Sequence, residues 1–257
     1  MALELLGTGF ARQRVAPVLV AVAVAAALRR PVLGARPLFA LAAGPALGPS
    51  TLPGALAYGV VAGLEGAGLT WALYALEGLY ARWVRAAGWR PLVGAAAVGV
   101  LARLDPRVLG VGYFWIRAVL AGRLGGASLA RLAAAKAAAW LLALASGTVG
   151  GVLAPLFLVG GASGGFLAHL APWAGLGPRA AALVSMAAVF GAASGAPWTA
   201  AVFAVEVTGD YAALPGILAA TALAAAVASR LLPYDIMTGK PVRRARRTVG
   251  EESRGAA

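Results

Sequence analysis

Long stretches without a charged residue are the feature that most constrains this chain. No Asp, Glu, Lys or Arg occurs between Lys136 and Arg179, and none occurs between Arg179 and Glu206. About 20 apolar residues make a helix that crosses the hydrocarbon core of a bilayer, so each stretch can hold one or two crossings. Hydrophobic residues make up 61% of the sequence, against about 45–50% in a soluble domain. The sequence therefore predicts an all-α membrane protein that crosses the bilayer several times.

The excess of basic residues fits membrane topology better than nucleic-acid binding. The formal net charge is +13, and many of the arginines lie between apolar runs or in the last residues of the chain. Basic residues gather in cytoplasmic loops and at lipid headgroups. We therefore expect a multi-pass protein of the inner membrane with a cytoplasmic C-terminus and no nucleic-acid partner. The absence of cysteine from the sequence excludes disulfides and thiolate metal sites.

The alternation of apolar runs with Gly, Pro and Arg predicts where the segments lie. Val15–Leu28 is short and basic residues follow it, so it could be a first span or a secretory signal. The other apolar segments are expected at Gly54–Val84, Pro91–Leu104, Leu129–Ala145, Pro155–Leu170, Arg179–Phe190 and Leu214–Leu232, with a loop over Pro31–Pro53. We expect residues 1–242 to form one transmembrane domain and residues 243–257 to be a disordered basic tail.

Two breaks inside apolar sequence each end one helix and open another. They are Ser146–Pro155 (SGTVGGVLAP) and Gly191–Pro197 (GAASGAP). Within a bilayer, freed backbone groups are tolerated only where they line a cavity or hold a ligand, and paired broken helices mark midplane sites in transporters. A helix N-terminus offers unpaired N–H groups and a partial positive charge. The first break therefore predicts an anion site inside the membrane.

Several motifs resemble those of the CLC family of chloride channels and chloride/proton antiporters. Gly150–Pro155 is similar to the family's second Gly-x-Phe-x-Pro motif, with Leu153 where the family usually has Phe. Gly191–Tyr211 resembles the block that follows, and Gly110–Tyr113 also fits. Tyr234 lies where the family has a tyrosine whose hydroxyl meets the central anion. The resemblance covers nearly the whole chain in order.

The resemblance implies tilted, broken helices arranged in inverted repeats and a function in transmembrane chloride transport, as a channel or as an antiporter. The implied anion site comprises Gly150, Gly151, Val152, Leu153, Pro155 and Tyr234. In this site the N–H groups of Val152 and Leu153 and the Tyr234 hydroxyl contact the ion. The first helix and those around Glu206 and Leu218 would form a homodimer. No enzymatic activity, cofactor or metal is expected, because chloride itself is the substrate.

Two motifs of the family's front half do not occur in the sequence. They are a Gly-Ser-Gly-x-Pro loop and a Gly-Arg/Lys-Glu-Gly-Pro loop that supplies the gating glutamate. Met1–Leu6 resembles the end of that half, where Glu4 would correspond to one of an acidic pair used in proton passage. The chain could therefore pair with a separate front-half chain. An alternative is a non-conducting remnant or half-subunit that acts as a structural or assembly partner in the membrane.

The remaining polar residues have competing interpretations. Glu65 and Glu77 could be proton carriers, but their apolar segment is long enough for both to lie near its ends in water. Gly161–Gly164 resembles the Gly-x-Ser-Gly motif of rhomboid proteases. Six residues along one helix separate Ser163 from His169 by about 9 Å and roughly 240°, so the two cannot form a catalytic dyad. We expect Ser163 to be a packing residue and His169 to lie at the membrane interface.

Overall fold

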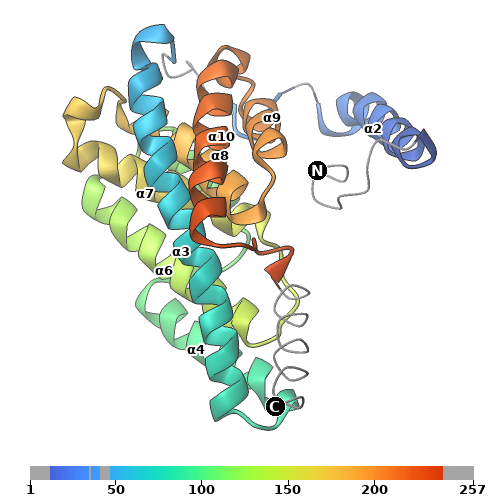
Figure 1. Ribbon diagram of the computed structural model, residues 1–257, viewed down its shortest axis with the longest axis vertical. Coiled ribbons are helices and arrows are strands. Elements are labelled where there is room, and N and C mark those ends of the chain that lie inside the picture. The colour runs from blue at the N-terminus through green and yellow to red at the C-terminus, as the bar shows by residue number, and fades with distance from the viewer. Residues whose placement is uncertain (1–11, 35, 41–46, 240–257) are drawn as a thin grey trace, which may run out of the picture.

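The computed structural model describes residues 12–34, 36–40 and 47–239, and in these ranges the fold is built of helices joined by turns and loops (Figure 1). The α-helices are α2 (Arg12–Leu33), α3 (Leu52–Trp83), α4 (Arg90–Leu104), α5 (Tyr113–Leu120), α6 (Gly126–Ala145), α7 (Leu153–Leu170), α8 (Pro178–Ser194), α9 (Pro197–Thr208) and α10 (Leu214–Leu231). Short 3-10 turns are η1 (Pro49–Thr51), η2 (Ala87–Trp89), η3 (Pro106–Val108), η4 (Pro172–Ala174) and η5 (Tyr211–Ala213). No strand occurs in the described ranges, so the predicted all-α class is confirmed.

Within the described ranges, four helical segments are long and apolar enough to cross a membrane. They are Pro49–Trp83, Gly126–Ala145, Leu153–Leu170 and Tyr211–Leu231. α8 is shorter than these, and every residue from Ala180 to Ser194 is buried by its neighbours. A helix enclosed in this way need not match the thickness of the bilayer, because protein rather than lipid surrounds it. The prediction of a multi-pass helical bundle is confirmed.

Glycines allow the central helices to touch backbone to backbone. A Cβ added to Gly63 of α3 would lie 2.7 Å from the carbonyl oxygen of Ala224 in α10, which runs beside α3 in Figure 1. A Cβ on Gly160 of α7 would lie 2.7 Å from the carbonyl oxygen of Ser185 in α8. Small residues at helix contacts are typical of membrane bundles, where close packing replaces the hydrophobic effect. Gly160 and Gly164 of α7 have the G-x-x-x-G spacing that allows such an approach, and both lie against the backbone of α8.

The second predicted break begins later than the sequence indicated. α8 continues through Gly191 to Ser194, and the turn comes at Gly195, which has φ +68°. Gly191 stays helical, and its missing side chain leaves room for α9, because a Cβ there would lie 3.2 Å from the Cα of Pro197. The glycine that looked like the start of a break is therefore a packing glycine.

α2 lies apart from the other helices (Figure 1). It is helical through Pro31, so the loop predicted to start at this proline begins later. Its apolar side chains are largely exposed, with Leu19 at 61% and Val22 at 60%. Such a surface is compatible with contact to lipid or to another subunit.

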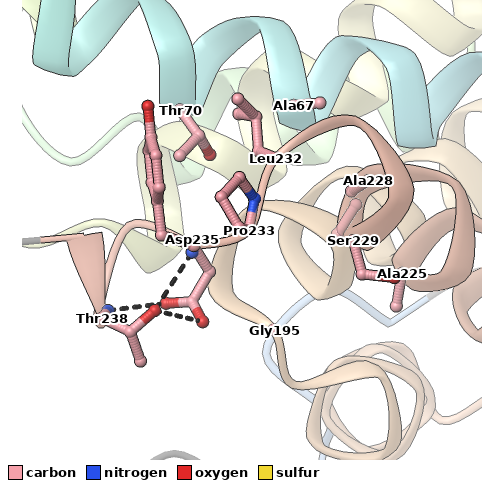
Figure 2. Close-up of a pocket in the computed structure, with 12 residues that line it drawn as sticks. Ala67, Thr70, Gly195, Ala225, Ala228, Ser229, Leu232, Pro233, Asp235 and Thr238 are labelled. Carbon is pink, nitrogen blue, oxygen red and sulfur yellow. Dashed lines mark hydrogen bonds between the residues drawn. The ribbon is translucent and has the colours of Figure 1, made fainter. Parts of the chain in front are cut away.

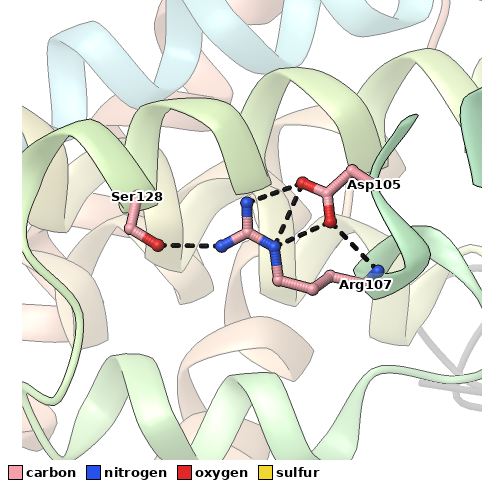
Figure 3. Close-up of polar contacts among 3 residues, drawn as sticks. All are labelled: Asp105, Arg107 and Ser128. Atoms are coloured by element: carbon pink, nitrogen blue, oxygen red, sulfur yellow. Dashed lines mark hydrogen bonds and ion pairs between the residues drawn. The ribbon is translucent and has the colours of Figure 1, made fainter.

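A charged cluster of Asp105, Arg107 and Ser128 stabilises the link between α4 and α6 (Figure 3). Asp105 Oδ1 accepts hydrogen bonds from the backbone N–H of Arg107 at 3.1 Å and from its Nε at 2.7 Å, and Oδ2 pairs with Nη2 at 2.6 Å. Arg107 Nη1 donates to Ser128 Oγ at 2.8 Å, and the guanidinium lies over the ring of Trp115. Arg107 thereby connects η3 to the first turn of α6 and to α5.

Acidification should weaken this cluster. The hydrogen bonds and charge of Arg107 lower the pKa of Asp105 below its ordinary value. The stabilisation is present above the unfolded pKa and is lost as pH falls through the folded pKa. We expect Asp105→Asn to reduce the free energy of unfolding by about 1 kcal/mol near pH 6, with the deficit shrinking toward pH 3. Thermal unfolding in detergent at both pH values measures this, and an equal deficit at both would contradict it.

Candidate anion site

The first predicted break forms an open turn between α6 and α7. Gly147 has φ +91°, a conformation that glycine adopts without strain. Val149 is 99% exposed, and Gly150 and Gly151 are exposed as well. α7 then begins at Leu153, two residues before the start of the expected segment at Pro155.

The first amides of α7 have no acceptor among the described residues. The N–H groups of Val152 and Leu153 donate no hydrogen bond there, and no side chain caps the helix. Pro155, in the first turn, has no N–H and so requires none. The start of a helix combines such unpaired donors with the positive end of the helix dipole. This terminus can therefore bind an anion through its backbone.

Side chains of α6 hold the turn in place. Trp140 Nε1 donates to the carbonyl oxygen of Gly151 at 3.3 Å. Ser146 Oγ donates to the carbonyl oxygen of Ala143 at 2.6 Å and lies 2.9 Å from Thr148 Oγ1. Sequence reasoning missed Trp140, although an indole N–H inside an apolar span needs an acceptor and could have indicated such a contact.

Tyr234 lies in a clamped segment after α10. Its ring meets the ring of Tyr74 of α3 edge-on, with 5.6 Å between the centroids. Tyr74 Oη donates to the carbonyl oxygen of Ile236 at 2.8 Å, and the Ile236 N–H donates to the carbonyl oxygen of Ala193 at 2.9 Å. These bonds hold the segment against both α3 and the end of α8.

A polar cavity of about 260 Å³ opens beside Tyr234 (Figure 2). Thr70, Ser229 and Asp235 also line it. Asp235 Oδ1 accepts hydrogen bonds from the N–H groups of Met237 and Thr238 at 2.7 and 2.8 Å, so its carboxylate caps the turn that follows. The hydroxyl groups of Thr70 and Ser229 therefore line the same cavity as Tyr234.

The two parts of the predicted site share no cavity and no hydrogen bond among the described residues. The cavity that Tyr234 lines includes no residue of Gly150–Pro155. Within the described part of the chain, no hydrogen bond or ring contact links Tyr234 to the start of α7. Their joint action on one ion therefore stays a prediction. Glu4 and the tail at 243–257 lie outside the described residues.

Glu65 corrects an expectation, because it does not lie near an end of its span. It occupies the central part of α3, is half-buried, and its Oε2 accepts a hydrogen bond from Ser163 Oγ of α7 at 2.7 Å. A carboxyl group withdrawn from water needs such a donor. Ser163 is thus a hydrogen-bonding partner as well as a packing residue. His169 does not approach it: His169 Nδ1 lies 2.8 Å from the Gly165 carbonyl oxygen instead.

Sequence reasoning also missed the buried cation Lys136. Lys136 of α6 is 4% exposed, and its Nζ donates to the carbonyl oxygens of Val108 and Gly110 at 2.7 and 2.8 Å. The lysine therefore binds the end of η3 and the link to α5. Its position beside apolar sequence gave no indication of this role.

Comparison with known proteins gives a family match over most of the chain. The family model described as voltage gated chloride channel matches residues 1–229. The voltage-gated ClC-type chloride channel ClcB of Salmonella typhi is 33% identical over 183 residues, which cover 69% of this chain and 43% of that protein. The chloride channel protein CLC-f of Arabidopsis thaliana is 34% identical over 149 residues, covering 52% of this chain and 19% of that protein.

Solved structures give the same architecture. A CLC-type fluoride/proton antiporter matches with a TM-score of 0.65 and 25% identity over 77% of this chain and 48% of that one. A slow cyanobacterial Cl⁻/H⁺ antiporter matches with a TM-score of 0.70 and 20% identity over 80% of this chain and 50% of that one. The chain therefore spans half or less of the length of these relatives, and it has their helical fold over that part.

Proposed function

Because the chain belongs to the voltage-gated chloride channel family, we propose that it takes part in moving chloride across the membrane. In this proposal, chloride gives up part of its hydration shell to the N–H groups of Val152 and Leu153. The observation that carries the proposal is that these two amides, at the start of an apolar helix, have no acceptor among the described residues. Backbone dipoles hold an anion less tightly than a fixed cation would, so the ion can also leave.

Tyr234 is the proposed second donor. Its hydroxyl would replace another part of the hydration shell, as the resemblance to the family implies. The clamp on its segment supports this role, because a ligand-binding hydroxyl must be held in position. The hydroxyl groups of Thr70 and Ser229 in the adjoining cavity would offer further contacts to water or ions.

We further propose an inner-membrane location with a cytoplasmic C-terminus. Gly239, at the end of the described chain, lies against Tyr74 in the second half of α3. Exposed Arg82 and Arg85 follow at the end of α3. The orientation is argued from the basic tail that follows Gly239 in the sequence, because the positive-inside rule expects such a tail on the cytoplasmic side.

The proposed assembly is a homodimer or a pairing with a separate front-half chain. The exposed apolar surface of α2, which includes Leu19 and Val22, supports a subunit contact. A front half would also cover the exposed turn before α7, and with it complete the anion site. Glu4 would then belong to a proton route that involves that front half.

Reconstitution tests transport against the alternative of a non-conducting assembly partner. The chain is placed in chloride-loaded liposomes, alone and together with a polypeptide carrying the two front-half motifs, and chloride efflux is measured with an electrode. Efflux in either preparation supports transport. Absence of efflux in both, from protein that is folded and inserted, would overturn the proposal and favour the non-conducting role.

A further inference from the structure

A strongly basic cavity lies away from the proposed chloride site. It has a volume of about 590 Å³ and is lined by four arginines, which are Arg36, Arg117, Arg123 and Arg179. Its other walls are apolar and come from Pro37, Leu38, Phe39, Ala40 and Ala121. No acidic side chain of the described ranges lines it. Four like charges around one cavity repel each other unless an anion lies among them.

Backbone contacts hold Arg117 and Arg179 in place at the cavity. Arg117 Nε donates to the carbonyl oxygen of Leu38 at 3.2 Å, and Arg179 Nε donates to the carbonyl oxygen of Leu120 at 3.1 Å. The guanidinium groups of Arg36 and Arg123 donate no hydrogen bond within the described residues. An arginine keeps its charge at all physiological pH values and matches the geometry of a phosphate group with two parallel donors.

The wall of the cavity is anchored to the bundle. The N–H of Phe39 donates to the carbonyl oxygen of Val207 at 2.6 Å, and the ring of Phe39 meets the ring of Tyr113 edge-on at 5.5 Å. The link after α2 is thereby held against both α9 and α5. The cavity is a feature of the packed structure rather than a gap beside a loose loop.

The cavity lies at one end of the spanning helices. Gly54, near the start of α3, approaches the carbonyl of Ala174 in η4, and Gly126, at the start of α6, lies against His169 at the end of α7. Arg117 comes from the last turn of α5, Arg123 from the link to α6 and Arg179 from the start of α8. A smaller cavity brings Arg179 together with His169 and Leu129, which lie at this same end. Because the segment Pro49–Trp83 is long enough to cross the bilayer, its start, with η4 beside it, lies at the level of the lipid headgroups.

A second cavity continues the first and is more apolar. It has a volume of about 230 Å³, shares Ala121 and Arg179 with the arginine cavity, and is lined in part by Val119, Leu124 and Leu129. A charged cavity that adjoins an apolar one suits a ligand with a phosphate group and a hydrocarbon part. A single chloride ion would fill little of this volume and balance only one of the four charges.

We propose that the arginine cavity binds the phosphate group of an anionic phospholipid at the membrane surface. The guanidinium groups of Arg36, Arg117 and Arg123 hold the phosphate oxygens, and the apolar walls accept the first carbons of the chains. This site is separate from the start of α7, so it does not depend on chloride transport.

Binding to purified protein in detergent tests the proposal. The probes are short-chain phosphatidylglycerol, short-chain phosphatidylcholine and inorganic phosphate, and the readout is the rise in the unfolding temperature as each probe is added. Phosphatidylglycerol should stabilise the protein saturably and more strongly than the other two. Arg123→Gln, which removes no side-chain hydrogen bond within the described residues, should weaken the apparent affinity for phosphatidylglycerol about tenfold, equivalent to about 1.4 kcal/mol. Arg117→Gln with Arg123→Gln should weaken it further.

Matched variants separate this site from general charge effects. Arg82→Gln with Arg85→Gln removes the same charge at the other end of α3 and should leave phosphatidylglycerol binding unchanged. Equal stabilisation by phosphatidylcholine, or wild-type affinity in Arg123→Gln and in the double variant, would overturn the proposal. An equal effect of inorganic phosphate at the same concentration would also overturn it, in favour of a site for free phosphate.

Discussion

Replacing Leu153 with proline is expected to reduce chloride efflux at least tenfold while the protein still folds. Proline removes the amide hydrogen at the first position of α7, a position at which helices commonly have proline. Its ring also restricts Val152, whose φ of −99° and ψ of −28° lie in the α region, so the folding controls are part of the test. A hydrogen bond to a charged partner contributes about 1.5–3 kcal/mol, which corresponds to roughly 10–150-fold in binding. Efflux from liposomes containing the transporting form, measured over a range of chloride concentrations, gives the change.

Leu153→Ala is the matched control, because it shortens the same side chain but keeps the amide. It should retain most of the efflux, and Ser163→Ala, which lies further along α7, should do so as well. Circular dichroism and the unfolding temperature check that the proline variant is folded. If Leu153→Ala were as inactive as Leu153→Pro, the side chain rather than the amide would be responsible, and the backbone site would be wrong.

The start of α7 could be predicted from sequence because its cause is local. Glycines that permit a turn, a proline in the first turn and a following apolar run are enough to mark a helix N-terminus. The charge-free stretches likewise predicted spans, since a bilayer imposes one length on every crossing. The end of α8 was placed wrongly for the opposite reason. Gly191 is a helix-packing residue. Its close approach to Pro197 of α9 is a tertiary contact, which a local sequence pattern does not reveal.

Pairings between distant segments could not be predicted in the same way. Glu65 and Ser163 come from different helices, and the hydrogen bond between them depends on how α3 and α7 pack. The arginine cavity likewise gathers Arg36, Arg117 and Arg179 from three separate parts of the chain. In sequence, each of these arginines resembled an ordinary basic residue at the edge of a span. Only the fold brings them around one cavity.

The contact between α7 and α8 leads to the second large expected effect. Gly160→Ala should lower the free energy of unfolding by about 3 kcal/mol, because the new methyl group would lie 2.7 Å from the Ser185 carbonyl oxygen and 2.8 Å from Val189 Cβ. The carbonyl belongs to the backbone of α8, a helix buried along nearly its whole length, so it cannot move aside alone. The unfolding temperature in detergent should fall by about 6–12 °C.

Gly161→Ala is the control for this effect, since it makes the same chemical change one residue further along. Its methyl group would meet Val119 Cγ1 at 3.6 Å and Met186 Cβ at 3.7 Å, which are ordinary contacts. Alanine favours a helix over glycine by about 1 kcal/mol, so Gly161→Ala should be neutral or stabilising. The same helix propensity favours alanine at Gly160. Only the collision with α8 can make the substitution destabilising there. Equal unfolding temperatures for the two variants would show that α7 and α8 are not in backbone contact.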